Sequence, residues 1–118
     1  MTLALALVIV LRVVDGDTLH VLDGERDVAV RVLGLDCPES TRNPKCRRLG
    51  AAACEDELPL GRAATARARE LLHPGDRVRL EGHRLDRYGR TLASVQLAEG
   101  RDLAAVLRSE GWCRAGGP

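Results

Sequence analysis

Aromatic residues are almost missing from this chain of 118 residues, which has no Phe, one Trp and one Tyr. A hydrophobic core must therefore be built from Val, Leu and Ala. With 45% hydrophobic and 30% charged residues, the composition is typical of a folded protein and argues against a disordered one. The length fits a single domain covering residues 1–118.

An excess of one charge is also missing, since 18 basic and 17 acidic residues leave a net charge of +1. Proteins that hold nucleic acid through its phosphates usually carry a clear basic excess, so only local clustering can indicate such binding here. The segment "STRNPKCRR" is one basic cluster, compatible with a solvated loop or with a surface that attracts a polyanion. Its cations are Arg42, Lys45, Arg47 and Arg48.

The four cysteines form no CxxC pair and have no His at zinc-finger spacing, which argues against a structural zinc site. Their even number is compatible with thiols in a reducing compartment or with two disulfides in an exported protein. Three pairings are open, and the spacing does not choose among them. The chain also has no GxSxG, Walker or dinucleotide-binding motif.

A membrane-spanning segment is missing as well. The N-terminal run "MTLALALVIVLRVV" is too short to cross a bilayer. It has no basic residue before the apolar part and no convincing cleavage site, so we expect most of it to be a first strand. If the protein is exported, we expect this chain to be its mature form.

Turn signals and hydrophobic periodicity predict the remaining elements. Asp-Gly turns separate three expected strands, 7–14, 18–22 and 28–35. The polar segment 36–59 holds Pro38, Pro44 and Pro59, and we expect a long loop there. A helix should begin at residue 60 and end before the Pro-Gly at 74–75, followed by strands 77–83 and 91–100 and a helix over 101–112.

This order of elements predicts an α+β fold that is mainly β, a five-stranded OB-fold barrel with two to three helices. Five strands with a helix between the third and the fourth are typical of that Greek-key barrel.

Two acidic motifs follow expected strands. In "DGDT", Asp15 and Gly16 make the turn, which leaves Asp17 available to a cation. "DCPE" adds Asp36 and Glu39 and, taken alone, is also compatible with a solvated loop. Together, carboxylates at neighbouring strand ends would suit a hard cation such as calcium, which takes oxygen ligands at about 2.3–2.6 Å.

Two arginines could accompany this acidic cluster. Arg31 lies five residues before Asp36, where the solvent face of a strand is an alternative, and Arg90 closes "DRYGR", where a surface turn is an alternative. Guanidinium groups match phosphate oxygens in a bidentate manner, so two of them near the carboxylates would form a phosphate clamp. Tyr88 could stack on a ligand, donate to a phosphate or pack over the turn. The three histidines show no ligand spacing.

The order of the motifs is more specific than any one of them. "VVDGDTLHV", "RVLGLDCPE", "LGRAATARARELL", "DRYGRTLASV" and "DLAAVLRSEGW" together resemble the staphylococcal nuclease family from residue 8 to residue 112. The resemblance implies a five-stranded barrel that cleaves DNA and RNA phosphodiester bonds with calcium.

Site residues follow from the resemblance by position. Asp17 and Asp36 would bind calcium, with the main-chain carbonyl of Cys37 as a third ligand. Glu39 would act on the attacking water as general base or by orienting it. Other members of the expected site would hold the phosphate (Arg31, Arg90) or border the nucleotide pocket (Asp86, Arg87, Tyr88).

Departures from the family pattern concern the cysteines and the C-terminus. Cys37 stands where the family often has Thr or Ala, and the extra cysteines resemble an exported bacterial branch. That branch implies the pairs Cys54–Cys113 and Cys37–Cys46 and a secreted or periplasmic protein. We also expect a monomer. The tyrosine that the family commonly places after the last helix is missing, which puts base stacking in question.

Two alternatives to a nuclease are open. One is a catalytically weak or inactive nuclease-like module that binds nucleic acid, although such modules typically lose the acidic and arginine positions that this chain keeps. The other is a small structural domain without a ligand.

Overall fold

The computed structural model describes residues 4–116. Five strands form a closed barrel in the order β1-β2-β3-β5-β4. They are β1 (Ala4–Asp15), β2 (Thr18–Asp23), β3 (Arg26–Val32), β4 (Arg77–Leu85) and β5 (Thr91–Gln96). Neighbouring strands are antiparallel except for β3 and β5, which pair in parallel. The predicted fold class, a mainly β five-stranded barrel with helices, is confirmed.

The core is aliphatic, as the composition required. Buried valines and leucines from every strand fill the barrel, among them Val10, Val21, Val30, Val78 and Val95. A register shift between Val10 and Arg12 interrupts the two-residue alternation of β1, so that Val13 also points inward.

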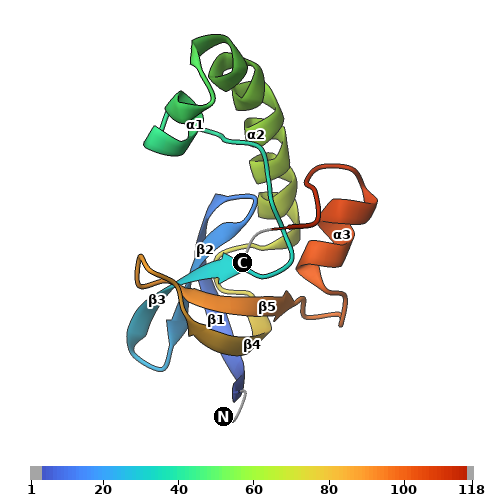
Figure 1. Cartoon of the computed structure of the whole chain (residues 1–118). Helices are drawn as coiled ribbons and strands as arrows, with labels where there is room; N and C mark the ends of the chain where they lie inside the picture. The colour runs from blue at the N-terminus through green and yellow to red at the C-terminus, as the bar shows by residue number, and fades with distance from the viewer. Residues whose placement is uncertain (1–3, 117–118) are drawn as a thin grey trace.

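Three helices complete the fold: α1 (Pro44–Arg48), α2 (Ala51–Leu71) and α3 (Leu103–Ser109). Figure 1 shows α1 and the first half of α2 extending beyond one end of the barrel, with α3 beside the second half of α2. None of the helices between residues 4 and 116 is both long and apolar enough to span a membrane.

The prediction of a loop over 36–59 was wrong for its second half. α1 lies inside that range, and α2 begins nine residues earlier than expected and continues through Pro59. Ala-rich sequence favours the helix, and Pro59 removes only the N–H that would bond the Glu55 carbonyl. Because Pro59 and Glu55 are both exposed, water can satisfy that carbonyl.

Strand and helix ends also differ from the predictions. β3 ends at Val32, because the chain turns at Gly34, whose φ of 75° is in the left-handed region. β5 ends at Gln96, and α3 covers only the centre of the predicted range 101–112.

Candidate active site

Two disulfides shape the loop that follows β3. Cys37 bonds to Cys113 and Cys46 bonds to Cys54, with Cα–Cα distances of 4.4 and 5.0 Å. The pairs expected from the family branch, Cys54–Cys113 and Cys37–Cys46, were therefore wrong. The reason is that α1 and the start of α2 place Cys46 against Cys54 and Leu58 in a small separate core, whereas Cys37 and Cys113 belong to the main core.

The segment around Asp36 is anchored on both sides. Its main chain pairs with Arg114 through two hydrogen bonds, Asp36 N to Arg114 O at 2.8 Å and Arg114 N to Asp36 O at 2.9 Å. Arg31 Nη1 donates to the carbonyls of Val32 and Leu35, both at 2.9 Å. The disulfide at Cys37 adds a covalent anchor next to these bonds, so the carboxylates of this loop stand on a fixed backbone.

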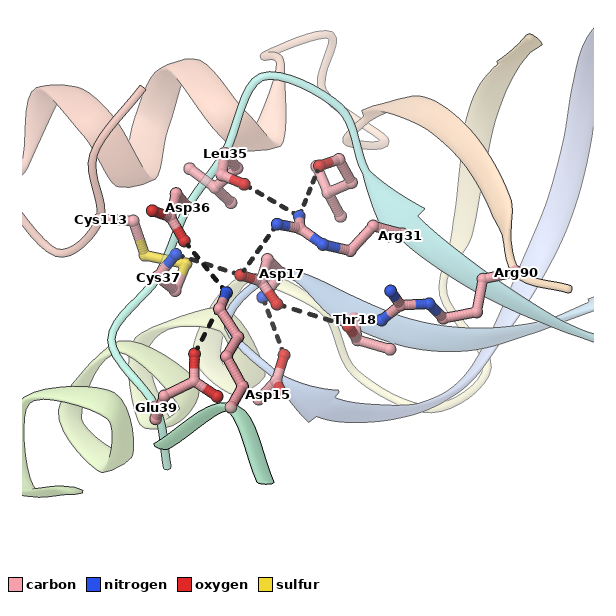
Figure 2. Close-up of polar contacts among 12 residues, drawn as sticks. Asp15, Asp17, Thr18, Arg31, Leu35, Asp36, Cys37, Glu39, Arg90 and Cys113 are labelled. Atoms are coloured by element: carbon pink, nitrogen blue, oxygen red, sulfur yellow. Dashed lines mark hydrogen bonds and ion pairs between the residues drawn. A yellow bond between two sulfur atoms is a disulfide. The ribbon is translucent and has the colours of Figure 1, made fainter. Parts of the chain in front are cut away.

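Asp17 connects the β1–β2 turn to this loop (Figure 2). Its Oδ2 accepts a hydrogen bond from Cys37 N at 3.1 Å and lies 3.5 Å from Arg31 Nη2. The side chain of Arg31 is only 7% exposed, so the alternative of a solvent-facing strand position is wrong. Asp17 is only 13% exposed, so the two side chains form a largely buried ion pair.

Asp15 contributes a second carboxylate to the turn, and its Oδ1 accepts from Asp17 N at 3.1 Å. Burial, together with the side-chain hydrogen bond and the negative charge of Asp17, raises the pKa of Asp15 to about 7. The turn was predicted, but this burial of Asp15 was not.

Glu39 lies at the other side of the site, with both of its carboxylate oxygens engaged. Asn43 Nδ2 donates to Oε1 at 2.9 Å, and Lys45 Nζ lies 3.4 Å from Oε2. Asn43 is at the same time the N-cap of α1, since its Oδ1 accepts from Cys46 N at 2.8 Å. Asn before Pro44 is a helix-start signal that could have located both α1 and this partner of Glu39.

Arg90 reaches the site from the turn between β4 and β5. Its Nε donates to Asp86 Oδ2 at 2.8 Å, and Figure 2 shows its guanidinium group directed toward Asp17 and Thr18. Asp86 Oδ1 accepts from the main-chain N–H groups of Tyr88 and Arg90, which holds the whole turn in place.

Tyr88 is exposed and has two guanidinium groups near its ring. The Cζ atoms of Arg87 and Arg90 lie 5.0 and 5.5 Å from the ring centroid, which are cation–π distances. The ring thus contacts two arginines of its own turn, while the residue is 67% exposed and lines the groove.

These side chains line two adjoining hollows. A small cavity of about 160 Å³ is lined by Asp15, Asp17, Glu39 and others, and a groove of about 1010 Å³ extends from it between α1 and the β4–β5 turn. Four residues line both: Arg31, Asn43, Lys45 and Arg90. The groove is basic, with six cationic side chains against two carboxylates (Arg31, Lys45, Arg48, Arg84, Arg87 and Arg90 against Asp36 and Asp86).

The carboxylates where the two hollows meet fit a hard cation with few protein ligands: Asp17 and Glu39 line the small cavity, and Asp36 lines the adjoining groove. The structure brings Asp17 next to Cys37 N and joins Asp36 and Glu39 through one ammonium group, that of Lys45, which stands in for a cation. Among the described residues, no three His, Cys, Asp or Glu side chains form a metal-binding group by themselves. A cation held by Asp17 and Asp36 would therefore also need main-chain oxygens or water, which calcium accepts readily.

Comparisons with known proteins agree with this geometry. The family model "Staphylococcal nuclease homologue" matches residues 29–116. The chain is 34% identical over 106 residues to Endonuclease YncB of Bacillus subtilis (strain 168), covering 87% of this chain and 44% of that protein. It is 38% identical over 110 residues to the Thermonuclease of Staphylococcus intermedius, covering 91% of this chain and 58% of that protein. The chain thus spans only about half the length of these relatives.

Proposed function

The chain belongs to the staphylococcal nuclease family, and on this premise we propose that it hydrolyses phosphodiester bonds of DNA and RNA. We further propose that calcium is the cofactor and that the sequence specificity is low. The observation that carries the proposal is the meeting of Asp17, Glu39, Arg31 and Arg90 around one small cavity at the end of a basic groove. A polyanion in the groove would present a phosphate to both arginines.

Each residue has a part in this reaction. Glu39 accepts a proton from the attacking water or orients it, because its carboxylate lines the cavity and is held by Asn43. Arg31 and Arg90 donate to the phosphoryl oxygens, where negative charge grows in the transition state. Asp17 and Asp36, with the Cys37 carbonyl, would hold calcium, which supplies positive charge and a polarised water when bound.

Nucleotide recognition would use the β4–β5 turn. Asp86 holds Arg90 and the turn, while Arg87 and Tyr88 present a cation and an exposed aromatic ring at the groove. Stacking on an aromatic ring tolerates any base, which is consistent with low specificity. The small number of aromatic residues makes Tyr88 the main stacking candidate on this surface.

The proposed site of action is outside the cytoplasm. Both disulfides would persist in an oxidising compartment, which supports a secreted or periplasmic protein. We expect it to act as a monomer, since the groove is formed within one chain.

The decisive experiment is digestion of plasmid DNA and of RNA with calcium and with a chelator. We expect degradation only with calcium, and a loss of about 100-fold or more in the Glu39→Gln protein. Glu99→Gln is the matched control, because Glu99 pairs with Arg101 and lines neither hollow. Salt-sensitive binding of DNA without cleavage under any divalent ion would instead favour a non-catalytic module.

A further inference from the structure

Among the residues that the structure describes, Lys45 is the one cation that forms ion pairs with both Asp36 and Glu39. Its Nζ lies 3.7 Å from Asp36 Oδ1 and 3.4 Å from Glu39 Oε2, and Figure 2 draws both ion pairs as dashed lines from the two labelled carboxylates. The first is an expected calcium ligand and the second is the expected base. The ammonium group thus neutralises the acidic side of the site from within the chain.

The same side chain also belongs to the basic groove. Lys45 lines both the small cavity and the groove, whereas its neighbour Arg48, one turn along α1, lines only the groove. The side chain of Lys45 is 60% exposed, so a rotation about its four-carbon stem can move the ammonium from the carboxylates into the groove. The pair with Asp36 is exposed at both ends and therefore weak, whereas Glu39 is only 13% exposed, so leaving Glu39 makes up most of the cost of this movement.

The position of α1 makes this double role specific to Lys45. Asn43 caps the helix and donates to Glu39, and the Cys46–Cys54 disulfide ties the helix to α2. These anchors lie on either side of Lys45 and keep its backbone at the boundary between the two hollows. The side chain is then the part that is free to exchange partners.

We infer that Lys45 is a tethered counter-cation, which holds Asp36 and Glu39 in the metal-free protein and moves to a substrate phosphate when calcium binds. The inference rests on the proposed function. Calcium must displace the Lys45 ammonium group from Asp36. Glu39 must also lose its ion pair with Lys45 before Glu39 Oε2 can accept a proton. Lys45 therefore competes with the metal and assists substrate binding. Its loss should strengthen calcium binding and weaken substrate binding.

The first test is calorimetric titration with calcium alone, without nucleic acid, of wild type, Lys45→Gln and Arg48→Gln. Arg48→Gln removes the same charge from the same helix, and no Arg48 ion pair with Asp36 or Glu39 occurs in the described part of the chain. We expect Lys45→Gln to lower the calcium Kd by about three- to tenfold and Arg48→Gln by less than about twofold. Equal calcium Kd values for Lys45→Gln and Arg48→Gln would overturn the inferred competition between Lys45 and calcium.

The second test is steady-state cleavage of a single-stranded oligonucleotide at saturating calcium. Both variants should raise KM severalfold, since each loses one phosphate contact. An unchanged KM for Lys45→Gln would overturn the transfer of Lys45 to the substrate. Calcium binding by wild type with no effect of Lys45→Gln contradicts this inference alone, whereas no binding by wild type contradicts the proposed function as well. Circular dichroism of each variant verifies its fold.

Discussion

The main chain of Gly61 in α2 lies directly against the main chain of Glu39. A Cβ at position 61 would overlap the Glu39 carbonyl group and would lie 2.6 Å from Ser40 N. Only glycine lets the helix approach so closely, and this contact sets where the loop carrying Glu39 runs. The helix therefore acts on the position of the expected base through the backbone of its loop.

Gly61→Ala should lower both stability and activity. Alanine favours a helix by about 1 kcal/mol over glycine, but overlap with a backbone that cannot rotate away costs more, so we expect a net loss of about 2 kcal/mol. Displacement of Glu39 should lower kcat about tenfold or more. Urea unfolding and plasmid digestion measure the two effects. Gly82→Ala is the control, because its nearest neighbour would be Thr91 Cγ2 at an ordinary 3.7 Å, and an equal effect of both changes would contradict the explanation.

Asn43→Ser separates the two functions of Asn43. Serine can still cap α1 at Cys46 N, but it loses the amide that donates to Glu39 Oε1. We expect nearly unchanged stability with a kcat lowered about tenfold, because a base whose orienting partner is lost is less well positioned. Asn43→Ala should show the same kcat defect and lose about 1 kcal/mol of stability in addition. Wild-type kcat in Asn43→Ser would show that the amide does not position Glu39.

The two disulfides should differ in what their removal costs. Cys37 and Cys113 are 76 residues apart and Cys46 and Cys54 only 8, so the entropic contributions are about 4.5 and about 2.5 kcal/mol. Paired Ser substitutions, compared by urea unfolding, should show this order. Loss of Cys37–Cys113 should also weaken calcium binding, since that bond anchors the loop of Asp36. A larger loss of stability on removing Cys46–Cys54 would contradict this assignment.

Asp86 should make stability depend on pH. Burial alone would raise the pKa of Asp86, but hydrogen bonds from Arg90 and from Tyr88 N–H outweigh it and lower the pKa below the ordinary 3.8. The stabilisation is thus complete above about pH 4 and is lost as the pH falls through the lowered pKa of the folded state. Asp86→Asn should be less stable than wild type near pH 6, and the difference should shrink in acid. Thermal melts of both proteins between pH 6 and pH 2.5 measure this difference in stability. A difference that stays constant over that range would rule out this linkage.

Much of the molecule was already determined by local sequence. Asp-Gly turns between β-branched runs are sufficient to define a meander, because two residues at a turn set the register of both strands. The spacing of Asp17, Arg31, Asp36, Glu39 and Arg90 along these elements supported the family resemblance that the comparisons confirm. Turn chemistry and strand ends thus identified the acidic and basic positions before any packing was known.

Tertiary structure decided which side chains and cysteines are paired, because such contacts depend on which segments, distant in sequence, meet in the fold. The pairing of Cys37 with Cys113, 76 residues away, follows from the return of the C-terminal segment to the loop after β3. Arg31 can be buried because its guanidinium group donates to the carbonyls of Val32, at the end of β3, and of Leu35, in the loop after it. The contact of Gly61 with Glu39 and the ion pairs of Lys45 depend on the direction of α1 and α2, which no local pattern specifies. The sequence by itself therefore determined which chemical groups are present, and the packing of helix on loop determined which of them touch.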